Sequence, residues 1–297
     1  MGFGQHQSFY LREGWLHKGL EAVSLDESLL AKPDAFEKMG IGKNMLTALR
    51  FWLIATGVTK YDVKNKIFSI TELGEEIFNN DSNLNLPFTR ALIHYNLAKN
   101  SEVNDLNGNR SSTVIYWFFN ELEGNMFERD LLLEKFTQWA SKFKDISINS
   151  LKRDIDCLLY MYDINNAFED PEDVLHSPLS SLELVSKKDN IVKLEGKIEN
   201  ISDELIYYIL VDYMNIHELD SLTLNEVINL KKLPGKLFNL KSEQILKNIF
   251  SLKKQGKLEF IQTNNLDTIQ IKNRPVNSIE VIKQFYKESR DINESII

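Results

Sequence analysis

Residues 40–78 constrain the fold more than any other part of this chain. Gly40 and Gly42 predict a tight turn, and the residues after them predict a helix with one buried stripe. The apolar stripe consists of Met45, Leu49, Trp52, Leu53 and Thr56. The polar residues on the other side of this helix are Lys43, Asn44, Thr47 and Arg50.

The residues after this helix predict a small hairpin. Gly57 closes the helix, and residues 58–61 and 67–70 read as two short strands joined by a polar turn. Thr71 is a typical N-cap residue for a further helix. Residues 34–39 supply a helix before the turn at Gly40 and Gly42. This order of elements predicts a winged helix-turn-helix, with the hairpin as the wing.

A winged helix suggests DNA contact, because its second helix presents polar side chains to base edges and its wing reaches phosphates. The expected contacts are Lys43, Asn44, Thr47 and Arg50 on the helix, and Lys60, Lys64 and Lys66 on the wing. Residues 40–66 carry a local charge of +4, whereas the whole chain carries -8. The same module also serves in protein–protein contacts, so both functions stay open.

The pattern recurs twice. Around residues 126–162, an amphipathic helix is followed by a turn with Ser147 or Asn149 as cap, and then by a second helix. Lys152 and Arg153 lie at the start of that helix and are candidate DNA contacts. Two aspartates follow at once and would repel phosphates, so this helix is equally suited to packing against protein.

The third repeat covers residues 221–271 and ends in a hairpin of residues 258–261 and 268–271. The predicted class is therefore mainly α with small β-hairpins (α+β), built of tandem winged helix-turn-helix modules. The expected modules are residues 1–100, 101–200 and 201–297. Residues 195–226 carry a charge of -7 and residues 231–257 a charge of +7. These two stretches could pair with each other, or the basic one could contact phosphates.

Composition limits the classes of function. The pI near 5.3 argues against a general nucleic-acid coat protein, so DNA contact must come from local basic faces. The single cysteine, Cys157, has apolar neighbours that predict a buried thiol, and it excludes a disulfide framework. We expect a cytoplasmic protein without membrane contact, since no signal peptide or long apolar run is present. No P-loop, HExxH or Gly-x-Ser-x-Gly motif occurs.

His6 is the candidate catalytic residue if the chain cleaves DNA. Cleavage needs a general base or a metal such as Mg²⁺ or Mn²⁺ held by carboxylates. His6 lies in a polar run before the first helix, whereas His94 and His217 lie in apolar helical patterns. The alternative is that His6 caps or hydrogen-bonds the fold.

Seven blocks of sequence resemble one bacterial family. They are FGQHQSFYLREGWLHKGL, GIGKNMLTALRFWL, LPFTRALIHYNLA, TVIYWFFNEL, SLKRDIDCLL, SPLSSLELV and PGKLFNL. In this order they are similar to a family of formerly unknown function, encoded beside PAPS-reductase-like proteins in DNA phosphorothioation islands and including the SspB-type DNA-nicking component. The resemblance implies double-stranded DNA as a partner, together with a PAPS-reductase-like protein, a cysteine desulfurase and an ATPase.

Three hypotheses follow. The first is a DNA-binding component of a bacterial phosphorothioate modification and defence system that nicks one strand for sulfur insertion. The second is a winged-helix transcriptional regulator. The third is a noncatalytic scaffold that docks the sulfur-transfer enzyme through the acidic stretch.

Overall fold

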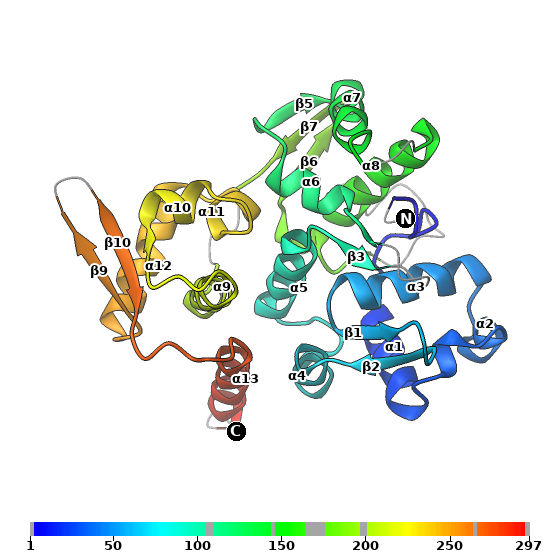
Figure 1. Ribbon diagram of the computed structural model, residues 1–297, viewed down its shortest axis with the longest axis horizontal. Coiled ribbons are helices and arrows are strands. Elements are labelled where there is room, and N and C mark those ends of the chain that lie inside the picture. The colour runs from blue at the N-terminus through cyan, green and yellow to red at the C-terminus, as the bar shows by residue number, and fades with distance from the viewer. Residues whose placement is uncertain are drawn as a thin grey trace. The chain divides into compact units, whose positions relative to one another are not determined.

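Short antiparallel strand pairs alternate with the helices throughout the described chain (Figure 1). The computed structural model describes residues 3–104, 110–143, 146–163, 176–196, 201–263 and 266–294. Its helices and small antiparallel sheets confirm the predicted α+β class. The chain divides into two compact units, Met1–Lys197 and Ile198–Ile297. The predicted boundary at residue 100 lies within the first unit and stays a prediction.

The first unit begins with helices followed by the hairpin expected around residues 58–70. Its elements are α1 (Trp15–Leu25), the 3₁₀ helix η1 (Leu29–Ala31), α2 (Ala35–Met39), α3 (Lys43–Ala55), β1 (Thr59–Asp62), β2 (Ile67–Ile70) and α4 (Glu72–Asp81). The predicted cap at Thr71 is confirmed, since its hydroxyl accepts a hydrogen bond from Gly74 N at 3.0 Å. Phe68 N donates to the carbonyl of Glu27 at 2.8 Å, so residues before η1 run beside β2.

Helix α3 is the centre of this part of the unit. It buries Leu49, Trp52 and Leu53, as the apolar stripe predicts. Helix α1 packs closely on it, because a Cβ atom on Gly19 would lie 2.6 Å from the Leu53 side chain. Only a residue without a side chain fits there without displacement of Leu53. One face of α3 is thereby fixed against the core, and Lys43 and Asn44 at its start lie at the outside.

The rest of the first unit contains the second predicted repeat. Its elements are α5 (Pro87–Lys99), β3 (Val103–Asn104), β4 (Arg110–Ser111), α6 (Val114–Asn120), β5 (Met126–Glu128), α7 (Arg129–Ala140), α8 (Ile148–Tyr162), the 3₁₀ helix η3 (Ser180–Leu182), β6 (Val185–Lys188) and β7 (Ile191–Leu194). The sheet order is β5-β7-β6, antiparallel throughout. The sequence did not predict β5 or β6, whereas Ser147 is confirmed as the cap of α8, accepting from Ser150 N.

An aromatic core joins α6 to α7. All residues of α6 are buried. The Trp117 and Phe136 rings lie 4.7 Å apart between centroids, and Phe3 makes an edge contact with Phe136 at 5.7 Å. The segment around residue 3 therefore packs against α7, which is distant from it in the sequence.

The second unit follows an order of elements similar to that of α6 to β7 in the first unit, namely helix, short strand, helices and hairpin. It consists of α9 (Asp203–Ile216), β8 (Leu222–Thr223), α10 (Leu224–Asn229), α11 (Pro234–Leu237), α12 (Ser242–Lys254), β9 (Leu258–Gln262), β10 (Asp267–Ile271) and α13 (Ile279–Glu294). The expected hairpin is confirmed, with Thr268 opposite Ile261 and Ile271 opposite Leu258. Its sheet order, β8-β10-β9, matches that of β5-β7-β6 in the first unit.

Across both units, none of the described helices combines the length and apolar character needed to cross a bilayer.

Candidate nucleic-acid interface

The start of α3 presents polar side chains to solvent. Lys43 and Asn44 are exposed, and the Lys43 ammonium lies 4.8 Å from the centre of the Phe36 ring. Thr47 is half-buried, and its hydroxyl donates to the carbonyl of Lys43 at 3.1 Å. Of the four residues predicted on this face, the first two are the ones that project freely.

Arg50 is directed into the protein instead. Its Nε donates to the carbonyl of Leu30 at 2.5 Å and its Nη2 to the carbonyl of Lys32 at 3.3 Å. Burial lowers the pKa of the half-buried guanidinium, and the neighbouring Tyr61 opposes that shift. Arg50 therefore joins α3 to the end of η1. Its expected contact with a guanine stays a prediction, and it would require these two hydrogen bonds to break.

The hairpin exposes its three lysines. Lys60, Lys64 and Lys66 all lie in solvent. Asp62 closes the turn between the strands, since its carboxylate accepts from the backbone N–H groups of Asn65 and Lys64 at 3.1 and 2.8 Å. These hydrogen bonds, with one from the Asn65 side chain, lower the pKa of Asp62. The acidic residue of this hairpin is thus used in forming the turn, and the lysines remain available.

Helix α8 exposes Lys152 and Arg153 near its first turn. The two aspartates that argued against DNA contact are both engaged with other groups. Asp156 forms an ion pair with Arg129 at the start of α7. Asp154 is 2% exposed and points into the core. The negative charge predicted to repel phosphates is therefore largely compensated or buried.

His6 is the buried hydrogen-bond partner of Asp154. Its Nε2 lies 2.6 Å from Asp154 Oδ1, which also accepts from Gly4 N at 2.9 Å. The imidazole is 3% exposed. Burial opposes its charge, but Cys157 and Asp154 outweigh burial and raise the pKa of His6 from 6.5 to about 10. Cys157 itself is buried, as predicted.

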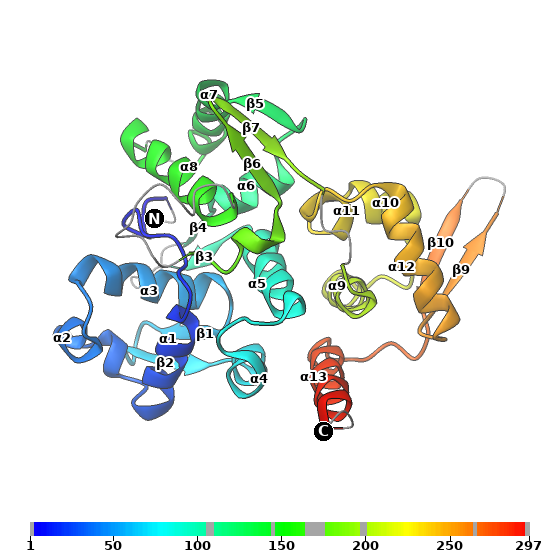
Figure 2. The same ribbon diagram turned by 180° about the vertical axis from the view of Figure 1, so that it is seen from behind.

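These contacts favour the structural alternative for His6. An imidazole that is protonated at neutral pH does not accept a proton from water. His6 also stacks on Trp52 of α3, with 5.9 Å between ring centroids. Figures 1 and 2 both show the N-terminal segment between α3 and α8. His6 therefore connects the two helices that carry the candidate DNA contacts and fixes their spacing.

No group of three or more His, Cys, Asp or Glu side chains lies together in the described ranges. Mg²⁺ is often held by one or two carboxylates together with substrate phosphates, so what these ranges lack is a preformed three-ligand site for Mg²⁺ or Mn²⁺.

Sequence reasoning missed Arg129. It lies directly after β5, a strand recognised only through its pairing with β7 across Phe127 and Val192. The run Glu128, Arg129, Asp130 reads as an ordinary solvated helix start. The sequence carries no local signal for this ion pair, because Arg129 and Asp156 are 27 residues apart and belong to different helices.

Comparison with known proteins gives a family and a fold. Residues 3–286 match the family described as "Protein of unknown function (DUF4007)". A structure described as "Magnesium ion-bound SspB crystal structure" has a TM-score of 0.84 at 20% identity, covering 97% of this chain and 89% of that chain. A second, described as "SspB crystal structure", has a TM-score of 0.80 at 21% identity with the same coverage. None of the curated proteins matches the chain. The resemblance expected from the seven sequence blocks is confirmed.

Proposed function

The chain belongs to the DUF4007 family and has the fold of SspB, and from this premise we propose that it is the DNA-binding component of a bacterial DNA phosphorothioate modification and defence system. The observation that carries the proposal is the paired arrangement of α3 and α8. Each helix exposes two polar or basic residues near its start, and His6 fixes the spacing between the helices.

We propose that three winged helix-turn-helix modules provide these surfaces. In two of them the order is helix, short strand, two or three helices and a hairpin, with the first strand pairing to the last. Those are α6 to β7 and α9 to β10. In the first module, residue 27 hydrogen-bonds to β2 in the place of the missing strand. On this assignment α3, α8 and α12 are the recognition helices, and such a helix enters a major groove by its N-terminal residues.

Electrostatics support contact through these local faces. The DNA-facing groups proposed are Lys43, Asn44 and Thr47 of α3, Lys60, Lys64 and Lys66 of the hairpin, and Lys152 and Arg153 of α8. Arg50 would act indirectly by holding η1 against α3. The net negative charge of the chain repels DNA at long range, so these basic faces must contact phosphates directly.

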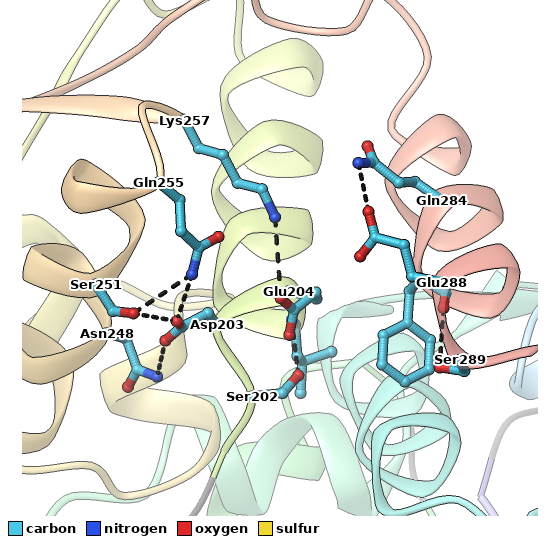
Figure 3. A network of polar contacts seen from close by, with 12 residues as sticks. Ser202, Asp203, Glu204, Asn248, Ser251, Gln255, Lys257, Gln284, Glu288 and Ser289 are labelled. Atoms are coloured by element: carbon cyan, nitrogen blue, oxygen red, sulfur yellow. Dashed lines mark hydrogen bonds and ion pairs between the residues drawn. The ribbon is translucent and has the colours of Figure 1, made fainter. Parts of the chain in front are cut away.

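Double-stranded DNA is the proposed partner, and the system would also contain a PAPS-reductase-like protein, a cysteine desulfurase and an ATPase. The scaffold alternative relied on the acidic stretch of residues 195–226. Several of its carboxylates are occupied within the second unit. Asp203 accepts hydrogen bonds from Asn248 and Gln255 (Figure 3). Glu226 forms a capping box with Thr223. That stretch is therefore less available for docking than its charge suggests.

The test is titration of a labelled duplex against the full-length protein. Replacing Lys152 and Arg153 together by Gln should weaken binding and reduce the slope of log K against log salt by about 1.8, since each phosphate contact contributes about 0.9. An unchanged slope would contradict the proposal for α8.

The ion pair of α8 offers a matched control. Arg129→Gln should weaken duplex binding by leaving Asp156 uncompensated, and the double change Arg129→Gln with Asp156→Asn should restore it. Strand nicking is tested separately with supercoiled plasmid and Mg²⁺, because one SspB structure is described as magnesium-bound. Open-circle product would distinguish a nickase from a winged-helix regulator, which would bind and leave the plasmid supercoiled.

A further inference from the structure

The second unit contains a large open hollow that the proposed DNA-facing helices do not use. Its volume is about 930 Å³, at the upper end of the range of about 300–1,000 Å³ found for small-molecule sites. Its walls come from the turn between α12 and β9, from the segment after β10, and from α13, and Tyr207 of α9 contributes to the lining. The hollow thus lies entirely within one unit.

Positive charge dominates its lining. Four lysines line the hollow, namely Lys257, Lys272, Lys283 and Lys287, against one acidic residue, Glu280. These lysines come from three separate segments, namely the turn before β9, the residues after β10, and α13. The basic run predicted at residues 231–257 contributes only the first of them. The charge of the hollow is therefore a product of the fold.

Lys283 and Lys287 are its most available cations. Both are exposed on α13 and lie one turn apart. Neither forms an ion pair within the described part of the chain. Like charges four residues apart destabilise a helix. Glu288, which lies next to Lys287, instead accepts a hydrogen bond from the Gln284 side chain at 2.8 Å. A bound anion would relieve the repulsion between the two ammonium groups.

The opposite wall is held in place by hydrogen bonds to the start of α9. Asp203 at the start of α9 accepts from Gln255 at 2.8 Å and from Asn248 at 2.9 Å, which fixes the turn after α12 (Figure 3). Lys257 follows in this turn. Its ammonium lies 3.9 Å from Glu204 Oε1, beyond hydrogen-bond distance, and 5.5 Å from the centre of the Tyr207 ring. Lys257 is thus positioned without being fully neutralised.

Lys272 is the most closely paired of the four lysines, because its ammonium lies 2.5 Å from Glu259 Oε1. The remaining lining groups include the amide side chains of Gln255, Asn273, Asn277 and Gln284. Amides can both donate to and accept from the edges of nucleobases. Ammonium groups in a recess suit the phosphates of a single strand, and the amides beside them suit its bases.

We propose that this hollow binds a single strand of DNA through its phosphodiester groups, with Lys283, Lys287 and Lys257 as the phosphate contacts. A recess suits one strand better than a duplex, whose convex surface is met by projecting helices. The choice of DNA rests on the proposed function. The site would hold a strand separated from its complement, while α3 and α8 bind the intact duplex.

The experiment measures binding of a labelled single-stranded 12-mer by fluorescence anisotropy with the full chain. The variant replaces Lys283 and Lys287 together by Gln. The matched control replaces Lys135 and Lys142 by Gln, since both are exposed lysines, on α7 and in the turn after it, that neither line the hollow nor belong to the proposed DNA-facing groups. The variant should bind about tenfold more weakly at low salt, with the salt slope reduced by about 1.4, because each single-strand phosphate contact contributes about 0.7. The control should keep the wild-type slope.

Three results would overturn the site: equal losses in variant and control, an unchanged affinity in the variant, or displacement of the strand by poly-glutamate as effectively as by unlabelled strand. The last would point to an acidic protein partner. Inorganic phosphate should compete only at much higher concentration than the oligonucleotide, and competition at equal phosphate concentration would reduce the site to one for a free anion. The duplex titration with the α8 variants does not depend on the single-strand assay. Failure of duplex binding by α3 and α8 can therefore be distinguished from failure of the single-strand site.

Discussion

Helices α3 and α8 both expose polar or basic residues near their starts, but they differ in which charged side chains are bound within the protein. In α3 it is the basic residue, and in α8 it is the acidic residues. In α3 no acid lies among the exposed residues, yet its arginine, Arg50, is bonded to two carbonyls of the preceding segment. In α8 two acids follow the exposed Lys152 and Arg153, yet Asp154 is buried against His6 and Asp156 is paired with Arg129. The difference shows that the capacity of a charged residue to contact DNA depends on the partner it already has.

The largest effect should come from the buried side of α8. Asp154→Ala leaves the His6 imidazolium buried without its carboxylate, so we expect a loss of about 3–5 kcal/mol in the free energy of unfolding. Chemical denaturation measures it. Asp156→Ala is the matched change on the same helix and should cost less than about 1 kcal/mol, because that ion pair is partly exposed. Equal losses would show that the two aspartates do not differ as described.

The pH dependence of stability should be the next largest effect. The folded-state pKa of His6 is raised from 6.5 to about 10, so the folded protein binds a proton that the unfolded chain releases between those values. The stabilisation is complete below pH 6.5 and is lost as the pH rises toward 10. The free energy of unfolding should therefore fall from pH 7 to pH 10 in the wild-type protein. His6→Gln should show a shallower decrease, and a parallel decrease would contradict the assigned charge state.

The smallest effect is expected on α3. Arg50→Ala removes the hydrogen bonds to Leu30 and Lys32, and we expect a loss of about 1.5–3 kcal/mol in the free energy of unfolding. The sequence-based alternative, a guanine contact, predicts unchanged stability and a loss of about 1–3 kcal/mol in discrimination between DNA sequences. Denaturation and duplex titration of one variant separate the two. Arg50→Lys serves as the control, since it keeps the charge and lacks the planar fork.

The elements that the sequence predicted correctly are those formed by near neighbours. The turn closed by Asp62, the cap at Thr71 and the cap at Ser147 each join residues within three or four positions. Strand β5 escaped prediction because it is three residues long and is defined by pairing with β7, more than sixty residues later. The direction of the Arg50 side chain also depended on where η1 places its carbonyls.

The candidate site was predicted in part for the same reason. Exposure of Lys43, Asn44, Lys152 and Arg153 follows from helical periodicity, and the structure bears out that exposure. Their assignment to DNA stays a prediction. The link from His6 to Asp154 spans 148 residues, and no local pattern indicates such a contact. The hollow of the second unit depends likewise on three separated segments, so its lysines did not stand out in the sequence.

The attachment of Gly4 and His6 to α8 has a consequence for biosynthesis. A ribosome adds about 5–20 residues per second, so roughly 7–30 s pass between the synthesis of His6 and that of Asp154, 148 residues later. During that interval α1 to α4 can assemble from local contacts, and the segment before them can pack on α3 but not yet on α8. Without Asp154 the imidazole lacks the carboxylate that raises its affinity for protons. The N-terminal segment is fixed in its final place only after α8 has left the ribosome and Asp154 binds His6.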